Sequence, residues 1–150
     1  MTEATIRFAK ETDLAEIVEL CHQHALYEKS EYDKTGKQEK LKTHLFCDQP
    51  HFNCLVAEVH NEVVGYATYI KQFATWDADF YIYMDCLFLN EKSRGYGIGE
   101  QIMNRIKEES QKMGCNLIQW QTPDFNTGAI RFYKRIGATS KSKERFFLEF

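Results

Sequence analysis

The sequence contains no apolar run that approaches the length needed to cross a membrane. Its first ten residues, MTEATIRFAK, also lack the apolar segment that a signal peptide requires. We therefore expect no membrane span and no signal peptide. Internal repeats and low-complexity segments are absent too, so the 150 residues are expected to form a single domain, residues 1–150, with a sizeable core.

A metal-ligand pattern is also missing. The five cysteines are odd in number and share no metal-ligand spacing. His22 and His24 lie close together, but no further Cys or His stands at zinc-finger spacing from them. We expect no metal ion, and we interpret the cysteines as reduced thiols of a cytoplasmic protein. They are Cys21, Cys47, Cys54, Cys86 and Cys115.

The chain has no strong excess of charge of either sign. Its net charge is −3 at pH 7, which argues against a nucleic-acid-binding surface. The small negative balance mildly favours a cationic partner. The charged run Glu31–Lys42 is interpreted as a solvated face.

The most informative stretch begins at Tyr81–Leu89, which is rich in aromatic and aliphatic residues and is typical of a strand. A glycine-rich turn, Arg94–Gly99, comes next. Apolar residues at positions 98, 102, 103 and 106 then have helical spacing. A strand, a glycine turn and a helix in this order form a common anion site, because the N-terminus of the helix offers unpaired N–H groups.

The spacing of the turn excludes two familiar phosphate motifs. The third glycine of the dinucleotide fingerprint would fall on Glu100, and no Gly-Lys pair of a P-loop follows. The pattern [RQ]-x-x-G-x-[GA], filled by Arg94, Gly97 and Gly99, resembles the pyrophosphate loop of the GNAT N-acetyltransferases, which bind acetyl-CoA. Taken alone, this stretch leaves open a glycine turn that binds no ligand.

A second motif resembles the same family. The segment Asn126–Ala138, NTGAIRFYKRIGA, matches the family pattern N-x-x-A-x-x-F-Y-x-x-x-G-[FA]. It follows the glycine loop with one expected strand between them. The segments LVAE (55–58) and VGY (64–66) also resemble the central hairpin of the family. The resemblance extends over essentially the whole chain and implies acetyl-CoA as co-substrate and a homodimer.

The expected elements agree with that fold. The patterns predict a strand, two helices, three strands, a helix, a strand, a helix and a final strand. An Asp13/Glu16 capping box is expected to begin the first helix, and Gly65 to mark a bulge or a close approach. The fold class is α/β in the mixed, α+β-like sense: a mostly antiparallel mixed sheet flanked by helices on both faces. The expected ranges are strands 5–8, 52–59, 63–70, 81–89, 116–122 and 145–150, helices 13–28, 98–113 and 126–137, a short helix near residues 41–45, and a loop at 71–79.

The closest subgroup resemblance is to the diamine (spermidine/spermine) N1-acetyltransferases. It rests on Tyr27-Glu28, on His51–Val59, on Arg94–Gly99 and on the segment FYKR (132–135). The chain departs from the subgroup on the central strand, where two adjacent acids are replaced by Asp85-Cys86. It departs again near the C-terminus, where KERFF (143–147) carries Phe in place of Trp. These departures affect the identity of the acceptor rather than the family.

Two residues are the candidates for catalysis. At pH 7 only about one alkyl amine in a few thousand is neutral, so a base must accept a proton, directly or through water. Asp85 is the candidate base, since strand alternation would place it among Tyr81, Tyr83, Leu87 and Leu89 on one half-buried face; a structural ion pair or an exposed edge position remains an alternative. The resemblance makes Tyr133 the general acid, although by composition alone it would be a core aromatic residue.

Other candidate residues would bind the two substrates. The resemblance implies that the backbone of the central strand pairs with pantetheine and that the loop holds pyrophosphate. An exposed carboxylate with an aromatic neighbour is also a reasonable ammonium site. The expected cofactor-binding residues are Leu87, Phe88, Leu89, Arg94, Gly95, Tyr96, Gly97, Ile98, Gly99, Glu100, Asn126, Ala129 and Tyr133. The expected amine-binding residues are Tyr27, Glu28, Trp76, Asp85 and Glu144.

These residues predict an acetyl-CoA-dependent N-acetyltransferase acting on a small, cationic, polyamine-like or diamine acceptor in a ternary complex. Two alternatives stay open. The acceptor could instead be an amino acid, an aminoglycoside or a protein amine, or the chain could be a non-catalytic acyl-CoA-binding module.

Overall fold

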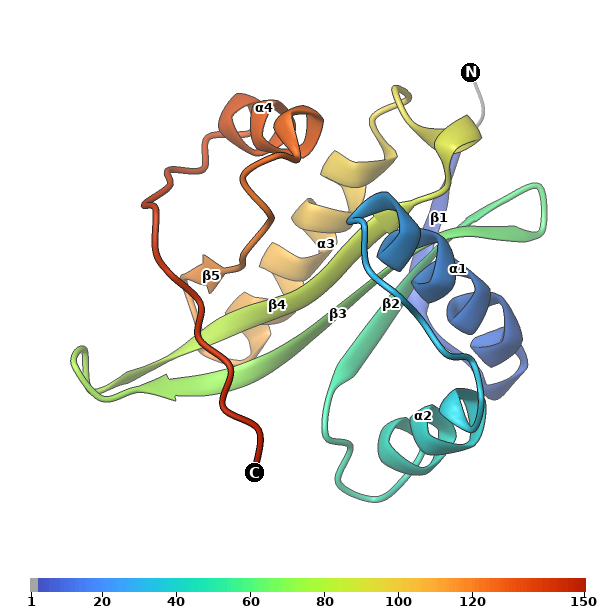
Figure 1. Ribbon diagram of the computed structural model, residues 1–150, viewed down its shortest axis with the longest axis horizontal. Helices are drawn as coiled ribbons and strands as arrows, with labels where there is room; N and C mark the ends of the chain where they lie inside the picture. The colour runs from blue at the N-terminus through green and yellow to red at the C-terminus, as the bar shows by residue number, and fades with distance from the viewer. Residues whose placement is uncertain (1–2) are drawn as a thin grey trace.

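The computed structural model describes residues 3–150, whose elements follow the predicted order except at the C-terminus (Figure 1). As predicted, two helices come between the first two strands in the order along the chain. The bounds are β1 Thr5–Phe8, α1 Leu14–Tyr27, α2 Lys37–Leu45, β2 Asn53–Val59, β3 Glu62–Ala74, β4 Asp79–Leu89, α3 Ile98–Lys112, β5 Ile118–Gln119 and α4 Thr127–Arg135, with short 3₁₀ turns η1 Glu11–Asp13 and η2 Glu91–Ser93.

The strands form one sheet in the order β1-β2-β3-β4-β5. All neighbours are antiparallel except β4 and β5, which are parallel. Helices α1 and α2 lie on one side of the sheet and α3 on the other, with α4 beyond the β5 end (Figure 1). The predicted mixed, mostly antiparallel α/β fold with helices on both faces is confirmed.

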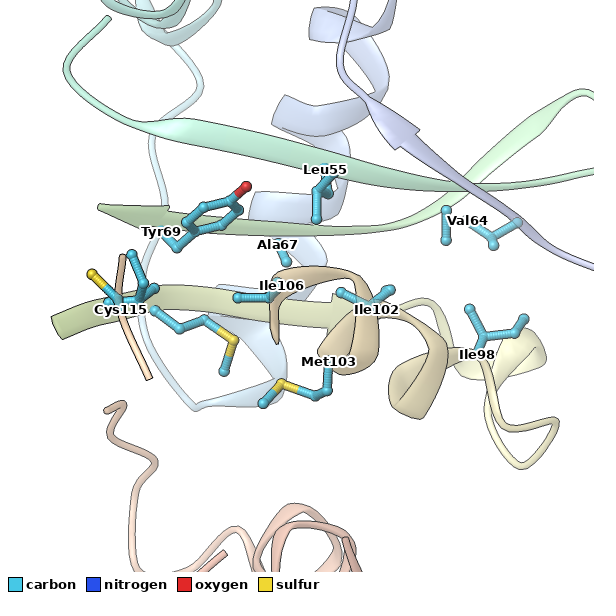
Figure 2. Close-up of a cluster of buried hydrophobic side chains, with 12 residues drawn as sticks. Leu55, Val64, Ala67, Tyr69, Ile98, Ile102, Met103, Ile106 and Cys115 are labelled. Atoms are coloured by element: carbon cyan, nitrogen blue, oxygen red, sulfur yellow. The ribbon is translucent and has the colours of Figure 1, made fainter. Parts of the chain in front are cut away.

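The larger apolar core lies between the sheet and α3 (Figure 2). Helical spacing turns the apolar side of α3 towards the strands, where Ile102 and Ile106 are almost fully buried. Tyr69 meets them from β3. Phe132 and Ile136 from the α4 region pack against the edge of this core, which fixes α4 beside α3.

A second core lies between the sheet and α1. Leu14, Ile17 and Leu20 face Val56 and Tyr66 on the sheet, and all five are buried. The Asp13/Glu16 capping box is wrong, because no side chain caps α1 within residues 3–150. Instead, the Asp13 carboxylate accepts hydrogen bonds from the backbone N–H of residue 10 and from both terminal nitrogens of the Arg7 guanidinium.

The predicted single-face alternation of β4 is also wrong. Thr68 pairs with Cys86 and Tyr69 pairs with Met84, so Asp85 is an extra residue in a β-bulge. Ile82 and Met84 before the bulge, and residues 87 and 89 after it, all pack on the α3 side. Cys86 packs on the α1 side. The bulge therefore shifts the alternation by one residue and removes Asp85 from the ladder.

A bulge also occurs near Gly65, where the register between β2 and β3 shifts. A Cβ atom on Gly65 would lie 2.4 Å from a Leu89 side-chain atom and 2.8 Å from the Phe88 carbonyl oxygen. Both the predicted bulge and the predicted close approach are confirmed.

Three segments differ from the sequence-based expectation, and the first is the strand expected at 116–122, of which only Ile118–Gln119 forms. The loop expected at residues 71–79 is instead the end of a long hairpin, held by an edge-to-face Phe73–Phe80 pair with ring centroids 5.1 Å apart. The strand expected at 145–150 does not form; this segment is exposed and pairs with no strand within residues 3–150. A strand needs an edge to pair with, and β5, at only two residues, offers almost none.

Candidate active site

The sheet opens between β4 and β5, and this opening creates the site. The two strands pair only at Ile82–Ile118 and Tyr83–Gln119, whereas β4 continues to Leu89. A cavity of about 490 Å³ lies along this unpaired edge and is closed by the end of α1, the glycine turn and α4. Most of the predicted residues line it: Tyr27, Glu28, Asp85, Leu87, Phe88, Leu89, Arg94, Gly95, Gly97, Ile98, Gly99, Asn126, Ala129 and Tyr133.

Four predicted residues lie outside this cavity. Tyr96 is exposed on the glycine turn, and Glu100 is exposed in the first turn of α3. Trp76 is fully exposed at the tip of the β3–β4 hairpin, and Glu144 lies in the exposed C-terminal segment. The fold of one chain therefore brings neither Trp76 nor Glu144 to the cavity.

The glycine turn has the backbone of an anion site. Gly95 and Gly97 have φ angles of 85° and 79°, in the left-handed region that glycine adopts without strain. Gly97 is the N-cap of α3, and within the described chain no side chain caps this end. The first N–H groups of α3 are thus available to an anion, which suits the pyrophosphate of acetyl-CoA.

A third glycine allows the helices to meet. A Cβ on Gly99 would lie 3.1 Å from the Phe132 ring, so the absence of a side chain lets α3 and α4 approach closely at the cavity wall.

Arg94 lines the cavity and is exposed. Its Nε donates to the Leu89 carbonyl oxygen at 3.0 Å. Its guanidinium lies 4.6 Å from the Tyr27 ring centroid and 5.2 Å from that of Phe88. The cation is therefore held by two aromatic faces beside the glycine turn.

Tyr133 projects from α4 into the cavity, edge-to-face with Trp120 at 5.0 Å between centroids. Burial, with a smaller contribution from the nearby Glu28 carboxylate, raises the pKa of Tyr133 to about 12. The phenol therefore keeps its proton at neutral pH and can donate it.

The bulge directs Asp85 to the cavity, where it is exposed. The expectation that Asp85 lies among apolar residues on a half-buried face is therefore wrong. Next to it, burial and then the Asp85 carboxylate raise the pKa of the Cys86 thiol to about 12, so Cys86 supplies no second negative charge.

Nine cavity residues were not among the predicted site residues: His24, Met84, Trp120, Gln121, Thr122, Gly128, Arg131, Phe132 and Arg135. His24 on α1 contacts Glu28 through Nε2 at 2.7 Å and the Tyr66 hydroxyl through Nδ1 at 2.9 Å. Its ring stacks on Phe88 with 4.9 Å between centroids. The available signal was the i, i+4 spacing of His24 and Glu28, which places both side chains on one side of a helix.

The structure also bears on a metal site and on a membrane span over residues 3–150. Over this range, no cluster of three His, Cys, Asp or Glu side chains is arranged to hold a metal ion. None of the helices in the same part of the chain is both long and apolar enough to cross a membrane.

Comparison with known proteins identifies the family. The model of the Acetyltransferase (GNAT) family matches residues 12–138. The thialysine N-epsilon-acetyltransferase of Bos taurus is 32% identical over 146 residues, covering 92% of this chain and 85% of that protein. The spermidine/spermine N(1)-acetyltransferase-like protein 1 of Homo sapiens is 27% identical over 93% of this chain and 21% of its own length. A solved aminoglycoside N-acetyltransferase in complex with CoA has a TM-score of 0.82 at 16% identity, covering 99% of this chain and 96% of that one.

These matches agree with the glycine turn, the α4 motif and the open edge of β4. The chain belongs to the GNAT family of acetyltransferases, and it is an N-acetyltransferase that uses acetyl-CoA.

Proposed function

We propose that the chain acetylates a primary amine of a small diamine or lysine-like acceptor by direct attack in a complex that holds both substrates. The supporting observation is the cavity itself, which gathers two carboxylates, Glu28 and Asp85, around the half-buried Tyr133. The glycine turn and the open β4 edge lie along the same cavity.

The two carboxylates come from different elements, since Glu28 ends α1 and Asp85 lies on β4. Each can accept a charge-assisted hydrogen bond of about 1.5–3 kcal/mol from an ammonium group. An acceptor with two positive charges uses both carboxylates, whereas a monoamine uses one. The arrangement therefore favours a diamine.

The chemistry divides between Asp85 and Tyr133. Acetyl-CoA supplies the acetyl group as a thioester, and the glycine turn with the β4 edge at Leu87–Leu89 holds its phosphate and pantetheine portions. Asp85 accepts a proton from the acceptor ammonium, directly or through water, so that the neutral nitrogen forms the new C–N bond. As the C–S bond breaks, the Tyr133 hydroxyl protonates the leaving sulfur.

The neutral Cys86 thiol bears on the length of the acceptor. The diamine subgroup that this chain resembles carries a second acid at this position. Without that charge, the longest and most highly charged polyamines lose one partner. Spermidine or a lysine-like diamine should therefore be a better acceptor than spermine, and the thialysine-acetylating relative supports a lysine-like acceptor.

The test is steady-state kinetics with acetyl-CoA and spermine, spermidine, putrescine, lysine analogues and a monoamine of matched length. We expect diamines to have kcat/KM values at least tenfold above that of the monoamine. Glu28→Gln should raise the KM for diamines about tenfold or more and lower kcat less, because it removes one charge partner. Glu16→Gln, an exposed change on the same helix, is the matched control. Equal use of the monoamine would refute the diamine proposal.

The same assay separates the alternatives. If only aminoglycosides, α-amino acids or peptide amines were acetylated, the acceptor would be of that class and the acetyl-transfer chemistry would stand. Failure to release CoA thiol with every amine, despite tight acetyl-CoA binding, would identify a non-catalytic binding module.

We also propose a homodimer in the cytoplasm. Phe146, Phe147, Leu148 and Phe150 are between 77% and 118% exposed, a concentration of apolar surface that marks association sites. The cysteines are free thiols, as a reducing compartment allows. Sedimentation equilibrium of wild type and Phe147→Asp tests the homodimer. The variant should be monomeric, and a monomeric wild type would refute the proposed dimer.

A further inference from the structure

We infer that His24 is a positioning residue that fixes the Glu28 carboxylate for the distal ammonium of the acceptor. The identity of that ligand rests on the proposed function. The bonding of His24 itself does not, because it is a property of the described chain alone.

Three contacts, each with a different element, hold the His24 ring in place. Its Nε2 lies 2.7 Å from a Glu28 carboxylate oxygen, one turn later on α1. Its Nδ1 lies 2.9 Å from the Tyr66 hydroxyl on β3. Its ring stacks on Phe88 of β4, with planes 18° apart. The side chain is 15% exposed, so little freedom remains for the ring.

These contacts select one tautomer. An ionised carboxylate only accepts hydrogen bonds, so the nitrogen facing Glu28 must carry a proton. In the neutral ring Nδ1 is then an acceptor, and the Tyr66 hydroxyl donates to it. That hydroxyl is well suited to the role, since Tyr66 is 2% exposed and burial raises its pKa far above the usual value. The Tyr66 hydroxyl thus donates to His24, and His24 donates to the Glu28 carboxylate.

The consequence for Glu28 is a fixed direction. The Glu28 side chain is 31% exposed and ends a helix, so without a partner its carboxylate would sample several rotamers. The bond from Nε2 occupies Oε2 and leaves Oε1 for a ligand in the cavity. A carboxylate held in place binds an ammonium without a further ordering cost, which lowers KM rather than raising kcat.

Substitutions at His24 separate this role from packing. His24→Phe keeps a ring on Phe88 but removes both nitrogens, and it should raise the KM for the best amine about tenfold with kcat and acetyl-CoA affinity within about twofold. His24→Gln, whose amide can still donate to Glu28, should recover most of the loss. His22→Phe is the matched control, because His22 lies on the same helix but stacks on Tyr32 outside the cavity.

His24→Phe would also leave the buried Tyr66 hydroxyl without its partner, which endangers folding. The double variant His24→Phe/Tyr66→Phe removes the imidazole and the Tyr66 hydroxyl together, so no buried hydroxyl is left without a partner. It should fold and show the same rise in KM.

A measurement free of any amine completes the test. The ¹⁵N chemical shifts of the His24 ring should show a protonated Nε2 and an unprotonated Nδ1, and Tyr66→Phe should move the Nδ1 shift while Nε2 stays protonated. If the acceptor proves to be a monoamine, the proposed function fails while this readout still stands. A ring protonated at Nδ1 alone, or an unchanged KM in the folded His24→Phe variant, would overturn the inference.

Discussion

The Tyr27 hydroxyl donates a 2.8 Å hydrogen bond to the side-chain oxygen of Asn126, 99 residues later in the chain. The bond joins the end of α1 to the start of α4, and both residues line the cavity. Asn126 in turn donates to Thr122 at 3.0 Å. Tyr27 is a predicted amine-binding residue. Its hydroxyl also links α1 to the start of α4, and its ring packs against the Arg94 guanidinium.

The glycine turn gives a direct test of cofactor binding. Gly97→Asp should abolish acetyl-CoA binding in calorimetric titration, because a carboxylate would face the pyrophosphate at the N-terminus of α3. The fold should survive with a modest loss of stability, since aspartate tolerates the left-handed φ of 79° better than most residues and open space surrounds Gly97. Gly114→Asp is the matched control: its φ of 77° is nearly that of Gly97, and open space surrounds it too, at the other end of α3. Equal affinity in the two variants would refute the loop assignment.

Removal of the Tyr133 hydroxyl tests the general acid. Tyr133→Phe should lower kcat roughly ten- to ten-thousand-fold, the range for loss of general acid catalysis, with little change in acetyl-CoA affinity. Tyr81→Phe removes a hydroxyl that instead accepts a bond from Gln72, and it should leave kcat unchanged. Wild-type turnover in Tyr133→Phe would show that this ring only packs.

The close approach at Gly65 predicts a stability change of definite sign. Gly65→Ala should lower the free energy of unfolding by about 1–3 kcal/mol, because the new methyl meets the Phe88 backbone oxygen at 2.8 Å. Gly128→Ala lies on α4 with its nearest atom 3.9 Å away, and should raise that free energy by about 0.5–1 kcal/mol. Denaturant titration of both variants measures the contrast, and two shifts of the same sign would contradict it.

The Arg7–Asp13 pair predicts an acid-dependent loss of stability. Hydrogen bonds from Arg7, and then from the residue 10 backbone, hold the pKa of Asp13 below its ordinary 3.8. A lowered folded pKa means that the stabilisation is complete above the unfolded value and is lost as pH falls through the folded one. Asp13→Asn should therefore cost about 3 kcal/mol between pH 5 and 7, and progressively less below about pH 4.

The experiment is urea unfolding of wild type and Asp13→Asn from pH 7 down to pH 3. Asp48→Asn, at an exposed turn, serves as the control and should show no such trend. A wild-type advantage that grew as the pH fell would contradict the assignment.

Periodicity and motifs predicted the parts of the fold that depend on local sequence. The apolar spacing of residues 98–106 predicted α3, and Gly114 predicted its end, where φ is 77°. Two motifs predicted the glycine turn and α4, and so most of the cavity lining. These features are fixed by residues close together in the chain.

Features that depend on contacts between distant residues were not predictable in the same way. The hairpin extends to Ala74 because Phe73 and Phe80 pack together across the two strands, and no local sequence pattern predicts that pair. The apolar residues near 145–150 suggested a strand, but a strand also requires a free edge. His24 acquires its role from Tyr66, 42 positions later in the sequence.

The bulge at Asp85 has a consequence for how the enzyme can evolve. Because Asp85 stands outside both hydrophobic layers, an exchange at this position opens no cavity and shifts no strand register. Selection can therefore exchange Asp85, the base that we propose, while the inherited scaffold keeps its stability, so exchanges at this proposed site and mutations that threaten folding fall at different positions of the same strand.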